Sequence, residues 1–273
     1  MANSSSSRRS SSVRRIIRGK GLSAGRIFGI ELRLDFSWFL TFVLITWALA
    51  TGIVTVLLPG LSLLQSILVS AGIALLFFLS LIAHELGHAW VAQRNGLAVP
   101  RITLFLLGGA AELVDEPPTP KVEFWMTLAG PLMSLLWAGM FFLIAWYART
   151  LSWASVVVVM ATIVADLNIV IGLFNLIPGF PLDGGRVLRA VIWRLTGNKL
   201  MATRVASGAG KLLAVGLMGF GLYRILIGNL VSGAWFIFLG FFLAEAAEAS
   251  YQQTVLHHYL SSVSVNDVMA AAP

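Results

Sequence analysis

The sequence lacks cysteine altogether and has few charged residues. Of its 273 residues, 58% are hydrophobic and only 11% are charged, whereas soluble domains carry about 25% charged residues. The missing cysteines exclude disulfide bonds and thiolate metal ligands. The low charge argues against an ordinary soluble domain, which needs a polar surface.

Long stretches contain no Lys, Arg, Asp or Glu. One lies between Asp35 and Glu85, and another lies between Glu123 and Arg149. Each exceeds the roughly 20 residues that an α-helix needs to cross a hydrocarbon core about 30 Å thick. These runs predict a membrane protein that resides in the lipid bilayer.

The apolar runs predict six transmembrane helices. Pro59-Gly60 ends the first, and Arg94-Asn95-Gly96 ends the second. The expected spans are residues 36–58, 64–93, 124–147, 151–176, 205–223 and 225–244. Residues 177–182 contain two prolines and a glycine, which excludes a regular helix there. A short helix is expected to restart after Asp183.

A second pattern predicts β-structure outside the spans. Residues 30–35 alternate apolar and charged side chains, a period of two that favours a short strand. Residues 102–107 and the following Gly108-Gly109 predict an apolar strand and a turn, and we expect the two segments to pair. The predicted fold class is an all-α membrane protein, with six transmembrane helices and a short re-entrant β-hairpin or sheet near the cytoplasmic side.

The net charge of +7 reflects in large part a basic, serine-rich N-terminal tail. Such a tail could bind nucleic acid, but positive charge beside a membrane span usually marks the cytoplasmic side. Lys and Arg also concentrate in residues 94–121 and 186–204. We therefore expect both termini in the cytoplasm and no nucleic-acid partner. The expected parts are a disordered tail (1–25), a membrane domain (26–250) and a linker (251–273).

The segment His84-Glu85-Leu86-Gly87-His88 carries the strongest chemical signal. On a helix, residues i and i+4 share a face, so both imidazoles can reach one metal ion. Glu85 flanks that face and can take a proton from water without being a ligand. The alternative is a pair of buried structural histidines. Ionisable residues inside a span are costly and usually functional.

A catalytic zinc ion takes three protein ligands and keeps a fourth position open. The other histidines, His257 and His258, lie beyond the last predicted span, so the third ligand is expected to be a carboxylate. The candidates are Asp166, Asp183, Glu112 and Asp115. Asp183 is favoured because it follows a helix break and precedes two glycines. We expect one Zn²⁺ per chain, held by His84, His88 and Asp183.

These motifs resemble the site-2 protease family of intramembrane metalloproteases. The matching segments are residues 84–88, 105–109, 129–131 and 174–186. The resemblance covers about Gly25 to Ala247. It implies zinc on the two histidines and Asp183, Glu85 as the catalytic base, and cleavage of a transmembrane protein substrate near the cytoplasmic face.

The expected substrate contacts come from two places. The resemblance implies that Asn175 contacts the substrate or the oxyanion, although a helix-capping role is equally compatible. The strand pattern suggests that the hairpin around residues 102–107 adds the unwound substrate as a further strand. The expected substrate-binding residues are Asn175, Ile102, Thr103, Leu104, Phe105, Gly108 and Gly109.

The C-terminal residues 264–269 resemble the start of a CBS domain. Some members of the family carry a pair of these domains at this point. We therefore expect a truncated chain, in which a nucleotide would bind only through a CBS pair that the sequence lacks.

Two other functions fit part of the pattern. A membrane metal-ion transporter or receptor would also use His and Asp, but it has no need for a glutamate between two histidines. Transporters also usually show related halves, and we see no internal repeat. A different membrane zinc protease, acting on terminal peptides, is disfavoured only by the family resemblance of the Asp183 segment. The sequence leaves open the substrate, the activating signal, the oligomeric state and the role of Asp166.

Overall fold

The computed structural model describes residues 21–106 and 108–260. Six of its helical segments are long and apolar enough to cross a membrane, which confirms the predicted number of spans. They are α2 (Phe36–Thr51) with α3 (Ile53–Leu57), α4 (Leu63–Arg94), α5 (Pro120–Thr150), α6 (Ser155–Asn175), α8 (Lys199–Leu226) and α9 (Leu230–Leu260). A shorter amphipathic helix, α7 (Asp183–Thr196), restarts where the sequence predicted it.

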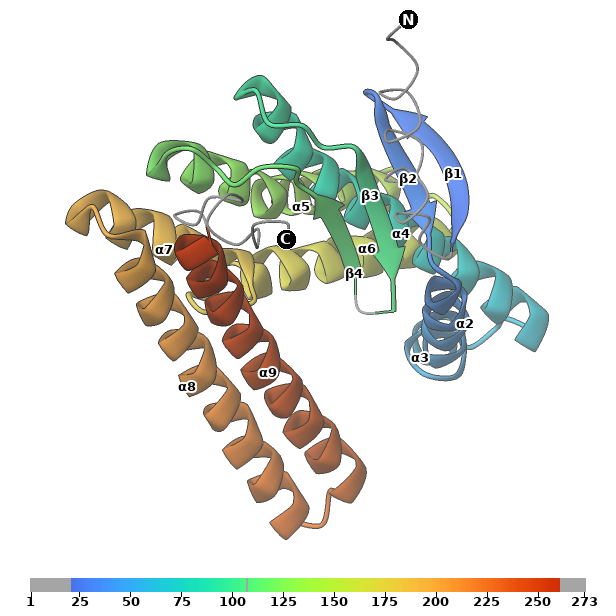
Figure 1. The fold of residues 1–273 in the computed structure, drawn as a ribbon. Helices are drawn as coiled ribbons and strands as arrows, with labels where there is room; N and C mark the ends of the chain where they lie inside the picture. Colours follow the sequence, from blue (N-terminus) through green and yellow to red (C-terminus); the bar gives the residue numbers. More distant parts are fainter. Residues whose placement is uncertain (1–20, 107, 261–273) are drawn as a thin grey trace, which may run out of the picture.

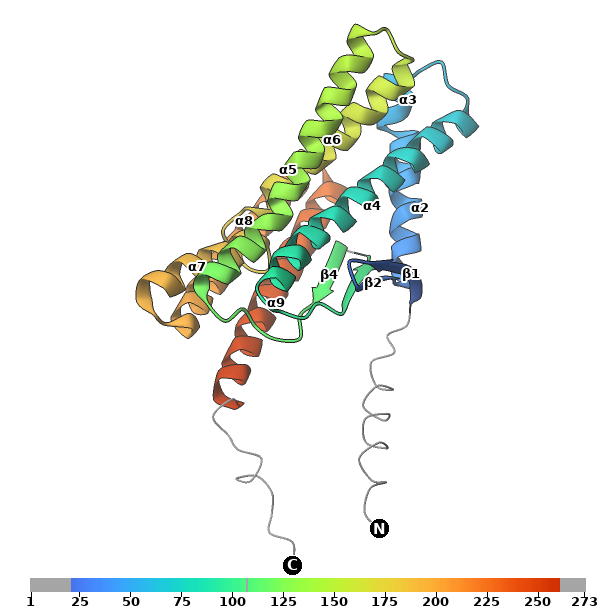
Figure 2. The same cartoon turned by 90° about the horizontal axis from the view of Figure 1, so that it is seen from above.

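Helices α4, α5 and α6 form the centre of the bundle (Figure 2). Helix α5 packs against both α4 and α6, which also contact each other, and α2 lies along α4. The α8–α9 hairpin diverges from the other helices toward its loop and joins them through α7 (Figure 1). The sheet, α7 and the start of α5 lie at one end of the molecule. The candidate functional site lies at this end.

Local sequence decides where the spans begin. Asp35 caps α2 by accepting a hydrogen bond from the Ser37 backbone N–H at 2.9 Å. The bonds from the Ser37 hydroxyl and backbone N–H also lower the pKa of the Asp35 carboxyl. Ser62 and Gln65 form a reciprocal capping box at the start of α4, and Thr119 caps α5. These side-chain oxygens satisfy amides that a helix leaves without an internal partner.

The four strands form one mixed sheet in the order β1-β2-β3-β4. Their bounds are β1 (Leu22–Ile27), β2 (Ile30–Leu34), β3 (Arg101–Phe105) and β4 (Gly108–Glu112). Strand β2 runs parallel to β3, and β3 runs antiparallel to β4. The predicted pairing of residues 30–35 with the hairpin is thus confirmed. Ile30 and Ile102 are buried in one cluster with Ala89 and Ala92 of α4, so the sheet is anchored to the helix that carries both site histidines.

Three described elements differ from the predicted pattern. Strand β1 starts at Leu22, inside the expected tail. The sequence did not predict it because its six residues are all exposed and show no apolar alternation. Gly108 and Gly109 open strand β4 rather than form a turn, and Gly108 has the positive φ of 144° that favours glycine. Helix α9 continues to Leu260, into the expected linker. The remaining tail and the CBS-like segment lie outside the described residues.

The broken segment 177–182 is fixed by contacts with α8. The Phe180 backbone N–H donates to the Ala206 carbonyl at 3.1 Å. A Cβ atom added at Gly210 would lie only 2.0 Å from the Phe180 carbonyl oxygen, so this approach requires glycine on α8. Phe180 itself is buried. The segment before Asp183 is therefore irregular in backbone but closely packed, and it delivers Asp183 at the start of α7.

Candidate metal centre

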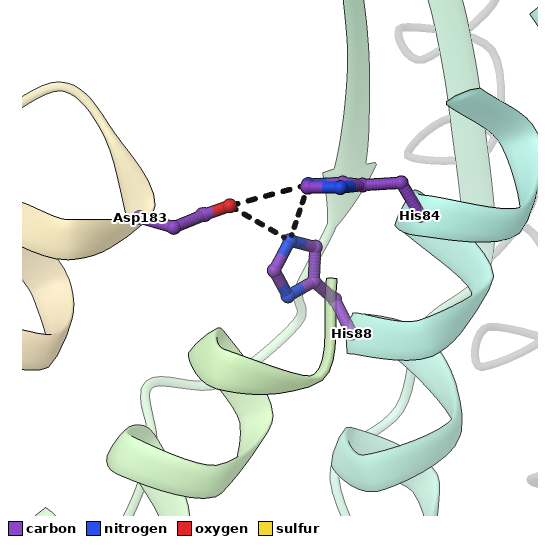
Figure 3. Close-up of side chains that lie close together, drawn as sticks. All are labelled: His84, His88 and Asp183. Carbon is purple, nitrogen blue, oxygen red and sulfur yellow. Dashed lines mark hydrogen bonds and ion pairs between the residues drawn. The ribbon is translucent and has the colours of Figure 1, made fainter. Parts of the chain in front are cut away.

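Three ligand atoms converge at the sheet end of the bundle. His84 and His88 lie one turn apart on α4, and Asp183 is the first residue of α7. The two Nε2 atoms are 3.1 Å apart. Asp183 Oδ2 lies 3.2 Å from His84 Nε2 and 3.3 Å from His88 Nε2. Figure 3 shows the resulting triangle, with both rings and the carboxylate pointing at one centre.

This triangle fits zinc. Zinc bonds to histidine nitrogen and carboxylate oxygen are about 2.0–2.2 Å long, and a tetrahedral arrangement of such bonds separates neighbouring donors by roughly 3.3 Å. The observed separations of 3.1–3.3 Å match that value on all three edges. Among the described residues, this is the one group of three His, Cys, Asp or Glu ligand atoms close enough for a shared ion.

The second nitrogen of each ring also has a partner. His88 Nδ1 lies 2.8 Å from the Met126 carbonyl oxygen, which can only accept. Nδ1 must therefore carry the proton, and the neutral ring offers its Nε2 lone pair to a metal. His84 Nδ1 lies 2.9 Å from the Ser134 hydroxyl. Both partners belong to α5, so this helix orients both rings.

Helix α5 can reach the histidines because it has no side chain at Gly130. A Cβ atom there would lie 2.2 Å from His88 Nε2 and 2.7 Å from His84 Nε2. Gly87 allows the same approach from α4, since its Cβ would lie 2.8 Å from the Ala129 carbonyl oxygen. The two glycines let the backbones come close enough for the carbonyl and hydroxyl contacts described above.

Glu85 and the three ligands line one cavity of about 680 Å³. Strand β4 forms another part of its wall. A Cβ atom at Gly109 would lie 2.6 Å from Glu85 Cγ, so the strand backbone passes directly beside this carboxylate. Further lining residues come from α2 and α9, which makes the cavity largely apolar apart from the ligands, Glu85, Asn175, Thr41 and Arg186.

The structure separates the other expected site residues. Asn175, Phe105, Gly108 and Gly109 line the cavity, whereas the remaining expected substrate contacts do not. Those three are Ile102, Thr103 and Leu104. Their strand, β3, is central in the sheet and is paired on both sides, so its backbone is already occupied.

The competing carboxylates lie away from the ligand atoms. Asp166 is exposed on α6, and Glu112 is the last residue of β4. Neither of these, nor the remaining candidate Asp115, belongs to the ligand group. Ser134 and the Met126 carbonyl were not predicted. For Ser134, the only signal in the sequence was a polar residue within an apolar span. The Met126 carbonyl belongs to the backbone, so the sequence contains no signal for it.

The model of peptidase family M50 matches residues 72–151 and 146–219. The chain belongs to this family. This confirms the resemblance to site-2 proteases, and a solved structure agrees with it. The site-2 protease from Methanocaldococcus jannaschii matches 85% of this chain and 95% of its own, with a TM-score of 0.55 and 27% identity.

Two curated relatives match the chain over 253 residues. The putative zinc metalloprotease Rip3 of Mycobacterium tuberculosis is 38% identical, and the putative zinc metalloprotease sll0528 of Synechocystis is 36% identical. Each match covers 91% of this chain. The chain spans only 63% and 64% of these relatives, respectively.

A first prediction tests the approach of α5. Gly130→Ala should weaken zinc binding at least about tenfold, as the loss of an orienting contact typically does, because the added methyl group displaces both Nε2 atoms. Gly139→Ala is the matched control on the same helix, since nothing lies within 4 Å of its Cβ position. Chelator competition on the folded proteins measures both affinities. Equal affinities would contradict the described packing.

A second prediction concerns the third ligand. Asp183→Ala should deplete zinc strongly, whereas Asp166→Ala should keep it, because only Asp183 brings a carboxylate oxygen to the histidines. Zinc quantification on the two purified variants and the wild type measures the difference. Depletion in the Asp166 variant alone would overturn the ligand assignment.

Proposed function

We propose that the chain is a zinc metalloendopeptidase that hydrolyses peptide bonds in or near the transmembrane segments of membrane proteins. One zinc ion per chain would be held by His84, His88 and Asp183. The observation that most directly supports this proposal is the triangle of ligand atoms beside Glu85, inside a bundle of six apolar helices. The two relatives named as putative zinc metalloproteases support the same chemistry.

Zinc, when bound, supplies a Lewis acid that polarises a carbonyl and lowers the pKa of water. Glu85 lines the same cavity without being among the ligands, so its carboxylate is available to accept the proton of the attacking water. The same group can return that proton to the leaving nitrogen. Asn175 also lines the cavity, and its amide can donate a hydrogen bond to the developing oxyanion.

A transmembrane substrate must unwind before cleavage, because helical amide groups are bonded to each other. Unpaired backbone groups in an apolar setting cost several kcal/mol each. Strand β4 offers replacement partners: β3 occupies one of its sides, and no strand pairs with the other among the described residues. In this proposal the substrate pairs with the free edge of β4 rather than with β3, near Gly109 and next to Glu85.

The orientation remains part of the proposal. His88 lies six residues before the end of α4 at Arg94, about 9 Å along a helix. The site is therefore close to the membrane face that carries the basic loops, which is the cytoplasmic face by the distribution of Lys and Arg. Because the number of spans is even, the proposal puts both termini on that same side.

Metal transport finds less support. An ion that crosses the membrane needs a succession of binding groups along its path. The described part of the chain contains a single cluster of this kind. Glu85 beside the cluster, outside the ligand set, suits a proton-transfer role instead.

A third prediction assigns the base. Glu85→Gln should retain zinc but lower proteolysis by about 10²- to 10⁴-fold, the usual contribution of a positioned proton acceptor. His84→Ala, the comparison variant, should lose both zinc and proteolysis. Zinc content and cleavage of a reconstituted transmembrane substrate give the two readouts. A Glu85→Gln protein that cleaves at a near-normal rate would show that another group is the base.

A fourth prediction tests strand addition. Alternate residues of an edge strand direct their N–H groups inward or to the open side, so proline is introduced separately at Ala110 and Ala111. Proline has no N–H group, so at the inward-facing position it removes a hydrogen bond to β3 and lowers the thermal stability. The variant that keeps wild-type thermal stability is therefore the one that has lost the outward N–H group. That variant should keep zinc and lose cleavage of a membrane substrate.

The matched control is Ala24→Pro on β1, the opposite edge of the sheet. Ala24 lies at the irregularity between Ser23 and Gly25 and has no register partner. It should leave both zinc and cleavage unchanged. Normal cleavage by the stable β4 variant would exclude the strand-addition proposal without affecting the metal assignment.

A further inference from the structure

Helix α5 contacts both histidines of the candidate metal centre. Its Met126 carbonyl and Ser134 hydroxyl contact the two histidine rings. Residues 123, 126, 130 and 134 share one buried face of the helix, as their spacing of three or four residues requires. The first of these is Glu123, a carboxylate with no exposed surface. The orienting face therefore extends to a buried charge that the proposed chemistry does not use.

Glu123 is held by Arg189 of α7. Arg189 Nε donates to Glu123 Oε1 at 2.6 Å, and Nη2 donates to the same oxygen. The Arg189 side chain is only 11% exposed. Its guanidinium also lies 5.2 Å from the centre of the Phe180 ring, in the broken segment that precedes Asp183. Arg189 thus connects the start of α5 with α7, which begins at Asp183, and with the broken segment that precedes Asp183.

We propose that Glu123 and Arg189 are positioning residues for the metal centre. Helix α5 orients the histidines through Met126 and Ser134, and it sets the place of Asp183 through this ion pair. The pair therefore determines how well the carboxylate completes the triangle, and with it the affinity for zinc. The inference deepens the proposed function, because it rests on Asp183 as the third ligand.

The alternative is that the pair merely stabilises the fold. Apolar contacts already hold α7 elsewhere: Phe180, Ala206, Ala247 and Leu188 form a cluster that joins α7 to α8 and α9. Loss of the ion pair would leave that cluster in place while removing the side-chain bond that ties α7 to the start of α5. A buried charge that loses its partner is also strongly unfavourable, so the freed charge would pull its helix toward water. Both effects displace Asp183 from the histidines.

The test measures zinc affinity by chelator competition on full-length protein, purified in detergent and restricted to the monodisperse folded fraction. Arg189→Lys keeps the charge but removes the guanidinium fork, and Glu123→Gln keeps the shape but removes the charge. Each should weaken zinc binding about 10- to 100-fold, the range seen when the partners of metal ligands are lost. When each variant is loaded with cobalt in place of zinc, its visible spectrum should differ from that of the cobalt-loaded wild type, because this spectrum reports on ligand geometry.

Rescue and a matched control separate positioning from general stability. The double variant Glu123→Gln/Arg189→Gln removes both charges and allows a neutral hydrogen bond, so its zinc affinity should recover relative to Glu123→Gln alone. Glu248→Gln breaks the ion pair between Lys211 and Glu248, which joins α8 to α9 rather than α5 to α7. It should leave the zinc affinity unchanged.

Two outcomes would overturn the inference and differ from failure of the proposed function. If the folded Arg189→Lys and Glu123→Gln proteins bind zinc as the wild type does, while Asp183→Ala loses zinc, the pair has only a structural role. If Asp183→Ala itself retains zinc, the metal centre is wrong and the positioning inference fails with it. Neither measurement needs a substrate, so proteolysis stays a separate question.

Discussion

The structure depends on bringing three ligand atoms within 3.3 Å of one another inside an apolar bundle. Two of them come from one turn of α4, and the third comes from α7, 99 residues after the first. Helix α7 packs chiefly on α5 and α8. The ligand set is therefore assembled through a third helix, α5, rather than by direct packing of the two helices that carry it.

That role explains the composition of α5. It must pass close to both imidazoles, which requires Gly130 in place of a side chain. It must also present acceptors to their outer nitrogens, which the Met126 carbonyl and Ser134 provide. At its start, buried Glu123 pairs with Arg189 of α7. An otherwise apolar transmembrane helix thus contains the polar groups that a metal centre needs around its ligands.

Hydrolysis within a bilayer has opposing requirements, since the substrate is apolar while water and an extended backbone are polar. For the proposed function, the cavity offers an apolar wall and a polar wall. Helices α2 and α9 contribute mainly apolar side chains, and β4 contributes a strand backbone beside Glu85. The sheet is anchored to α4 through Ile30 and Ile102, so the strand edge and the ligands keep a fixed relation.

The sequence alone determined the features that depend on local spacing. Uncharged runs predicted the six spans, the i, i+4 histidines predicted a shared ligand face, and two prolines predicted the break before Asp183. Only the tertiary structure decided that β4, rather than β3, lies at an edge of the described sheet, and that α5 supplies the partners of both rings. Contacts such as His84 with Ser134, 50 residues apart, leave no periodic trace, because they arise where separate helices meet.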